Sequence, residues 1–124
     1  MIIPRDTLEE FFSDTRALLR NGRANFNVDE VCLWSFFFVD SSPDAFSSLA
    51  AHLEACGYFN VGVLVPNLGE RRGESGSMYY LRADRLERLT VDDLLDRNRE
   101  LSDLAVHFGV KDYDGMDVGG IDGP

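Results

Sequence analysis

The chain has 124 residues, which is the length of one domain and enough to enclose a sizeable hydrophobic core. Hydrophobic residues make up 44% of it and charged residues 27%, and this balance excludes a wholly disordered chain. Twelve basic residues against 22 acidic ones give a net charge of −10, which disfavours direct binding to nucleic acid or to an anionic membrane and favours a protein partner with a basic surface.

The excess negative charge lies in two separate segments. Residues 24–70 contain six acids and no Lys or Arg, and residues 103–124 contain five acids and one Lys. If the fold brings these segments together, they form one acidic surface. The longest apolar stretch, residues 31–39, is too short to span a bilayer, and two cysteines do not make a disulfide framework, so we expect a cytoplasmic protein.

Residues 7–20 predict an N-terminal helix. Asp6 or Thr7 is expected to cap it, because Glu9 is placed to return the capping hydrogen bond, and Gly22 allows the chain to leave the helix. Apolar residues recur every three or four positions, so one face of this helix is expected to pack on the rest of the protein.

Residues 31–39 predict a central β-strand. Both alternating faces are apolar, with Ser35 as the polar exception. A strand of this kind is covered on both sides or lies at a subunit contact. The helix at 7–20 is therefore the expected cover for the second side, and the alternative is a homodimer formed through the sheet.

The remaining elements are each bounded by a cap, a glycine or a proline. They are a helix that begins at 42–44 and ends at Gly57, a strand at 58–65, a strand that starts at 78, a helix from Thr90 to Gly109 with Asp93 in a capping box, and a strand at 110–118. Residues 67–77 are expected to form an exposed loop.

The order strand, helix, strand, strand, helix, strand indicates two split units that share one four-stranded antiparallel sheet, with both helices on one face. We therefore predict one α+β domain over residues 1–124. It consists of the N-terminal helix, a ferredoxin-like core at 30–118 and a tail at 119–124.

Residues that could carry out chemistry are few and poorly arranged. His52 and Cys56 are four apart on a predicted helix and could both reach one metal ion, but zinc needs three or four ligands and Cys32 would have to come from a strand. The glycine-rich loop Gly69–Ser77 lacks the Gly-Lys-Ser/Thr ending of a phosphate-binding loop and leads into a strand. We expect no catalytic residues, no metal and no cofactor.

Short motifs near the ends of two predicted helices are shared with a known family. Residues 101–110 read Leu-x-x-Leu-Ala-x-x-Phe-Gly-Val and Tyr-Asp-Gly follows at 113–115, while Cys-Gly-Tyr at 56–58 ends the earlier helix. Over about residues 7–118 the chain resembles the regulator of ribonuclease activity B family. It departs from the family pattern in Met116, where members commonly have Trp, and in having only six residues after Val118, where members can carry a long acidic tail.

The resemblance implies a ferredoxin-like, non-enzymatic protein that binds the endoribonuclease ribonuclease E and inhibits it by protein–protein contact. The family offers no catalytic residues to carry over. The alternatives are an immunity-type inhibitor of a basic toxin and a small metal- or ligand-dependent enzyme that uses His52, Cys56 and the open sheet face.

The predicted contact residues for a basic protein partner belong to the last strand and to the turn before the central one. They are Asp112, Tyr113, Asp114, Met116 and Asp117, joined by Asp29 and Glu30 if the start of the central strand lies beside the last strand.

Overall fold

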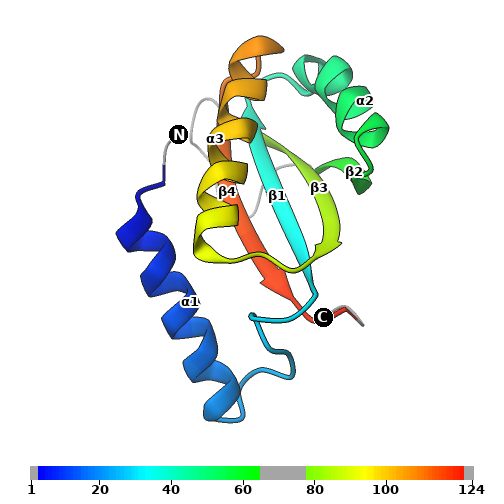
Figure 1. The fold of residues 1–124 in the computed structure, drawn as a ribbon. Coiled ribbons are helices and arrows are strands. Elements are labelled where there is room, and N and C mark those ends of the chain that lie inside the picture. Colours follow the sequence, from blue (N-terminus) through cyan, green and yellow to red (C-terminus); the bar gives the residue numbers. More distant parts are fainter. Residues whose placement is uncertain (1–2, 65–77, 122–124) are drawn as a thin grey trace, which may run out of the picture.

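The computed structural model describes residues 3–64 and 78–121 (Figure 1). Its elements, in chain order, are α1 (Arg5–Arg20), β1 (Cys32–Asp40), the 3₁₀ turn η1 (Pro43–Phe46), α2 (Ser47–Ala55), β2 (Phe59–Leu64), β3 (Tyr79–Glu87), α3 (Val91–His107) and β4 (Asp112–Gly119). The loop predicted at 67–77, with its glycine-rich part Gly69–Ser77, and the last three residues of the predicted tail lie outside the described residues.

The strands form one antiparallel sheet in the order β2-β3-β1-β4. The central position of β1 follows from its sequence, because an apolar strand is stabilised by a neighbour on each side and a cover over its face. The α+β, ferredoxin-like arrangement predicted from the order of elements is confirmed.

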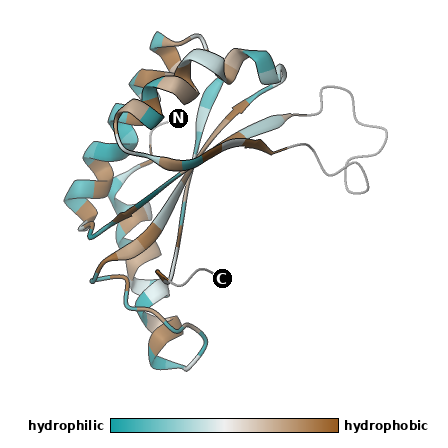
Figure 2. Ribbon diagram, turned by 90° about the vertical axis from the view of Figure 1, so that its right-hand side faces the viewer, coloured by the Kyte–Doolittle hydropathy of each residue, from teal (hydrophilic) through white to brown (hydrophobic). Residues whose placement is uncertain are grey.

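All three helices lie on the same face of the sheet (Figures 1 and 2). The side chains of Trp34, Phe36 and Phe38 point to that face, because they alternate along β1, and all three are fully buried. Phe36 packs against Tyr58 and the guanidinium of Arg97 in α3.

The N-terminal helix covers the other end of this aromatic row. Phe11 and Phe12 of α1 pack on Trp34, with ring centroids 6.2 and 6.0 Å apart, and Arg5 forms an ion pair with Asp92 of α3 at 2.6 Å. The prediction that this helix covers the second side of the sheet is therefore wrong. Phe11 and Phe12 reach Trp34 from the helix side of the sheet, and the Arg5–Asp92 ion pair places α1 beside α3.

The opposite face of the sheet, called here the open face, carries no helix from the described residues. Leu33, Phe37 and Val39 of β1 are half-buried there, and Leu86 of β3 is 48% exposed. Beside them Asp84 is fully buried and accepts hydrogen bonds from Arg82 Nε at 2.8 Å and Asn60 Nδ2 at 3.0 Å. The expected cover over the second side is thus missing from this part of the chain, and the homodimer stays a prediction.

The helix ends agree with the sequence at three glycines and at one cap. Gly22, Gly57 and Gly109 have positive φ angles where the helices end. Thr90 and Asp93 form the predicted capping box of α3, in which each backbone N–H donates to the other's side chain at 3.1 Å.

The predicted cap of the first helix is wrong, and Ser42 is the N-cap of the second, followed by Pro43 as predicted, but makes no side-chain hydrogen bond there. α1 begins at Arg5 without a side-chain cap, because its N-cap residue is Pro4, whose side chain has no acceptor; the Pro4 carbonyl accepts the first helical hydrogen bond, from the Leu8 N–H at 3.3 Å. The first turn after Ser42 is 3₁₀. None of the helices in residues 3–64 and 78–121 combines the length and the apolar character needed to cross a membrane.

Candidate protein-binding surface

The predicted contact residues gather on β4, which is an edge strand. β4 has β1 on one side and, among the described residues, no strand on the other. Its three aspartates are Asp112, which is half-buried, and Asp114 and Asp117, which are exposed. The five predicted residues of this strand have different surroundings, because alternate side chains point to opposite faces of a sheet.

Tyr113 points into the core. Its side chain is fully buried, its ring centroid lies 5.4 Å from that of Phe38, and its hydroxyl donates a hydrogen bond to Oδ1 of Asn98 at 2.6 Å. Burial raises the pKa of Tyr113. This side chain fixes β4 to α3 and offers no surface to a partner.

A β-bulge places Asp114 at the strand edge. Phe38 lies opposite Tyr113 and Phe37 lies opposite Gly115, so Asp114 is the extra residue of β4. Gly115 has φ +128°, which glycine adopts without strain. Burial, and then the nearby charge of Asp112, raise the pKa of Asp114.

The other two aspartates bind the strand's own backbone. Asp112 Oδ1 accepts the hydrogen bond of the Tyr113 N–H, and Asp117 Oδ1 accepts that of the Val118 N–H, both at 2.9 Å. Carboxylates placed in this way on an edge strand discourage unspecific pairing with other strands. Met116, the remaining predicted residue of β4, is half-buried and its sulfur accepts a long contact of 3.8 Å from Asn98 Nδ2.

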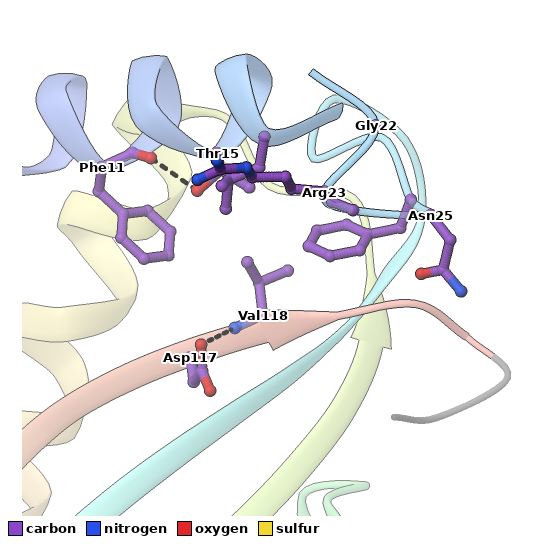
Figure 3. A pocket seen from close by; sticks show the side chains of 10 residues that line it. Phe11, Thr15, Gly22, Arg23, Asn25, Asp117 and Val118 are labelled. Carbon is purple, nitrogen blue, oxygen red and sulfur yellow. Dashed lines mark hydrogen bonds between the residues drawn. The ribbon is translucent and has the colours of Figure 1, made fainter. Parts of the chain in front are cut away.

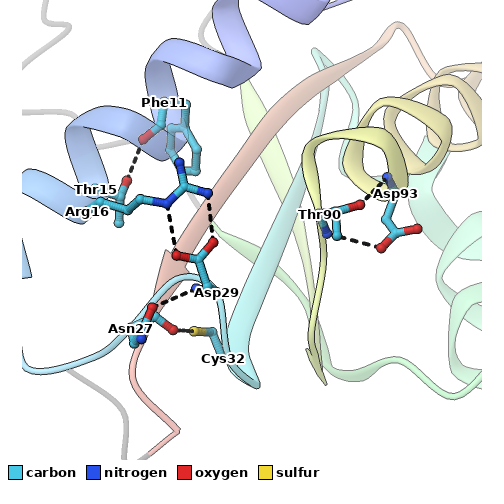
Figure 4. A network of polar contacts seen from close by, with 8 residues as sticks. All are labelled: Phe11, Thr15, Arg16, Asn27, Asp29, Cys32, Thr90 and Asp93. Atoms are coloured by element: carbon cyan, nitrogen blue, oxygen red, sulfur yellow. Dashed lines mark hydrogen bonds and ion pairs between the residues drawn. The ribbon is translucent and has the colours of Figure 1, made fainter.

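Asp29 is engaged within the molecule (Figure 4). Arg16 of α1 donates two hydrogen bonds to its carboxylate, at 2.9 and 2.7 Å, and these bonds lower the pKa of Asp29. The pair attaches the loop before β1 to the end of α1, and its charges largely cancel.

Glu30 reaches the far end of β4. It is exposed and lines a small hollow together with Gly120 and Ile121, next to the point where Leu33 of β1 pairs with Gly119. The structure therefore brings Glu30 to the Asp117 end of β4, whereas Asp112 lies at the opposite end of the strand.

A groove between α1 and β4 was not predicted from the sequence. Its larger part, a hollow of about 520 Å³, is lined by Phe11 and Leu18 of α1, by Arg23 and Phe26 of the following loop, and by Val118 (Figure 3). A second hollow of about 350 Å³ lies toward the start of α1. One signal in the sequence could have indicated this groove. Leu18 is an apolar residue near the end of α1, whereas the residues of α1 that are buried in the core come earlier in the helix.

His52, on α2, and Cys56, the residue that follows the helix, lie together as their spacing predicts, with Nε2 and Sγ 3.6 Å apart. Cys32 is buried on β1, where its thiol donates to the carbonyl of Asn27 at 3.1 Å. In the part of the chain that the structure describes, no three His, Cys, Asp or Glu side chains are grouped to hold a metal ion.

Comparison with known proteins decides the family. The family model for the regulator of ribonuclease activity B matches residues 13–118, from α1 to β4. The chain belongs to this family. A search of curated proteins found no match. Membership of the regulator of ribonuclease activity B family makes this chain one of a group of ribonuclease regulators. The matched range includes the bulge of β4 and the groove residues from Thr15 to Val118, and it begins after Phe11.

Proposed function

We propose that this protein inhibits an endoribonuclease of the ribonuclease E type in the cytoplasm, by direct protein–protein contact and without catalysis. The observation that carries the proposal is the family match over residues 13–118. The contact surface we propose is the acidic edge, defined as Asp112, Asp114 and Asp117 of β4 together with Glu30.

The charge of the chain supports a basic partner surface. Ribonucleases that hold RNA present cations to its phosphates, and a protein of net charge −10 is attracted to such a surface. Exposed charges at the rim of an interface mainly raise the rate of association and make it sensitive to salt. Asp29 contributes little to this attraction because Arg16 already neutralises it.

The test compares two double variants in an assay of RNA cleavage by a ribonuclease E-type enzyme. Asp114→Asn with Asp117→Asn removes two charges from the acidic edge, and the amide introduced by Asp117→Asn keeps an oxygen that can accept the Val118 N–H. Asp44→Asn with Asp103→Asn removes two exposed charges from η1 and α3 and serves as the matched control. We expect the first variant to inhibit about three- to tenfold less strongly and the control to inhibit like the wild type.

Loss of folding does not account for the expected result. Because burial and Asp112 raise the pKa of Asp114, its charge is unfavourable in the folded state, and Asp114→Asn removes that penalty. Absence of inhibition by the wild-type chain would refute the proposed function. Equal inhibition by both variants would show that the acidic edge is not the contact surface.

A further inference from the structure

We propose that the groove between α1 and β4 binds an extended, basic segment of the partner, which adds to β4 as a fifth strand of the sheet. The inference rests on the proposed function and specifies how the partner is held. Strand addition uses the backbone of an exposed sheet edge for affinity and the neighbouring pockets for alternate side chains.

The geometry provides both an open edge and a flanking helix. The start of α1, at Thr7 and Phe11, faces Asp114 and Met116, and its later part, at Thr15 and Leu18, faces Asp117 and Val118. α1 and β4 therefore run side by side in the same direction. Phe11 lines both hollows, so they adjoin and form consecutive parts of one groove along the strand; Figure 3 shows the larger of the two.

The groove contains apolar surface that the described fold leaves uncovered. Leu18 is 42% exposed, and Phe26 and Val118 are only partly buried. In an added strand every second side chain points to the helix side of the sheet. Apolar residues at those positions would enter the groove and cover Leu18, which explains why a long apolar side chain is exposed at this point of α1.

The charges beside β4 favour a basic segment. Asp114 lines one hollow together with the start of α1, and Asp117 borders the other, with its carboxylate on the open-face side of the strand, opposite Ser35. The cation among the described lining residues of the two hollows is Arg23. An incoming strand must take the Val118 N–H from Asp117, which leaves that carboxylate without its present donor. A Lys or Arg on the incoming strand replaces the lost partner, whereas a neutral or acidic strand does not.

The experiment selects ligands from a random dodecapeptide library displayed on phage, using the full chain as bait. We expect enriched peptides to alternate apolar residues with Lys or Arg. Binding of a synthetic enriched peptide is then compared between Leu18→Glu and Leu19→Glu. Leu19 is the matched control because it is 39% exposed on the same helix and does not line the groove.

Strand addition predicts three results. Leu18→Glu weakens peptide binding at least tenfold and Leu19→Glu leaves it unchanged. N-methylation of the peptide amides that face β4 abolishes binding while its side chains stay the same. Addition of the unmodified peptide shifts the backbone amide resonances of Met116 and Val118.

Several outcomes would overturn the inference. They are an absence of enriched peptides, equal binding to the Leu18→Glu and wild-type chains, and amide shifts at Leu33 and Phe37 of the open face in place of β4. The peptide measurements are made without a ribonuclease, so their outcome is independent of whether the proposed function is correct. Full inhibition of the ribonuclease by Leu18→Glu would keep that function and refute the groove as its binding site.

Discussion

Tyr113 and Asn98 place a polar pair inside an apolar core. Each side chain is nearly or fully buried, and the 2.6 Å bond between them attaches the edge strand β4 to α3. A buried polar group lowers the stability of the fold unless its hydrogen bond is made. The pair therefore specifies the register in which α3 lies over β4.

Removing one partner of this pair should be costly. Tyr113→Phe leaves Oδ1 of Asn98 without its buried donor, and we expect the free energy of unfolding to fall by about 1–3 kcal/mol in urea titrations. Tyr80→Phe, at a half-buried position on β3, is the control and should change it little. If the two substitutions cost the same, the hydrogen bond does not contribute as proposed.

Asp84 should make the stability of the fold depend on pH in the acidic range. Burial of its carboxyl acts to raise the pKa, but hydrogen bonds from Arg82, Asn60 and Ser35 outweigh burial and the pKa of Asp84 is lowered. A lowered folded-state pKa contributes stability above the unfolded value of about 3.9, and this stability is lost as the pH falls through the folded-state pKa. The Tm difference between wild type and Asp84→Asn, measured from about pH 7 to about pH 2, should be largest at neutral pH and shrink below about pH 4. A difference that stays constant over this range would contradict the assignment.

The sequence predicts that some residues of the site are exposed, but it does not predict the contacts that the residues make with other elements. Asp114 and Asp117 were expected on the surface of the last strand, and the structure exposes both there. The burial of Tyr113 and the pairing of Asp29 with Arg16 depend on which elements meet in space, and a pattern along the chain does not contain that information.

At the scale of elements, local signals determine where helices and strands occur. The capping box at Thr90 and Asp93 and the glycines at the helix ends need only neighbouring residues, so they were predictable. The face of the sheet on which α1 packs is determined by tertiary contacts. It is set by the contacts of Phe11 and Phe12 with Trp34, a residue distant in the sequence, and periodicity along residues 7–20 does not show them.

The bulge in β4 can be tested through its glycine. Gly115 has φ +128°, and a Cβ there meets no atom within 4 Å, so the cost of Gly115→Ala is backbone strain alone. We expect a loss of about 1–3 kcal/mol in the free energy of unfolding. Gly119→Ala is the matched control, since that glycine also has open space but no positive φ. Equal stability of the two variants would show that the bulge relaxes without cost.

At the scale of the whole molecule, the two acidic segments meet at both ends of β4. Asp40 of the first segment accepts the Lys111 N–H at 2.8 Å, next to Asp112 of the second. Glu30 belongs to the first segment and Asp117 to the second, and both lie toward the end of β4. Other acids of the first segment, such as Asp44 and Glu54, belong to η1 and α2. The expected single acidic surface is therefore confined to the surroundings of β4 and does not include every acid of the two segments.

Salt should act in opposite directions on folding and on binding. A net charge of −10 repels itself within the folded chain, so raising the salt from about 0.02 M to about 0.15 M is expected to raise the Tm slightly. The same increase screens the attraction between the acidic edge and a basic partner, so the affinity for the ribonuclease should fall, mainly through slower association.

Measuring both quantities in the same buffers separates the two effects. A loss of affinity that accompanies a rising Tm cannot come from unfolding and must arise at the interface. In Asp114→Asn with Asp117→Asn the salt dependence of affinity should be shallower than in the Asp44→Asn, Asp103→Asn control, because the charges that salt screens at the interface have been removed. Affinity that stays flat for the wild-type chain over this range would mean that apolar contacts in the groove, rather than the acidic edge, hold the partner.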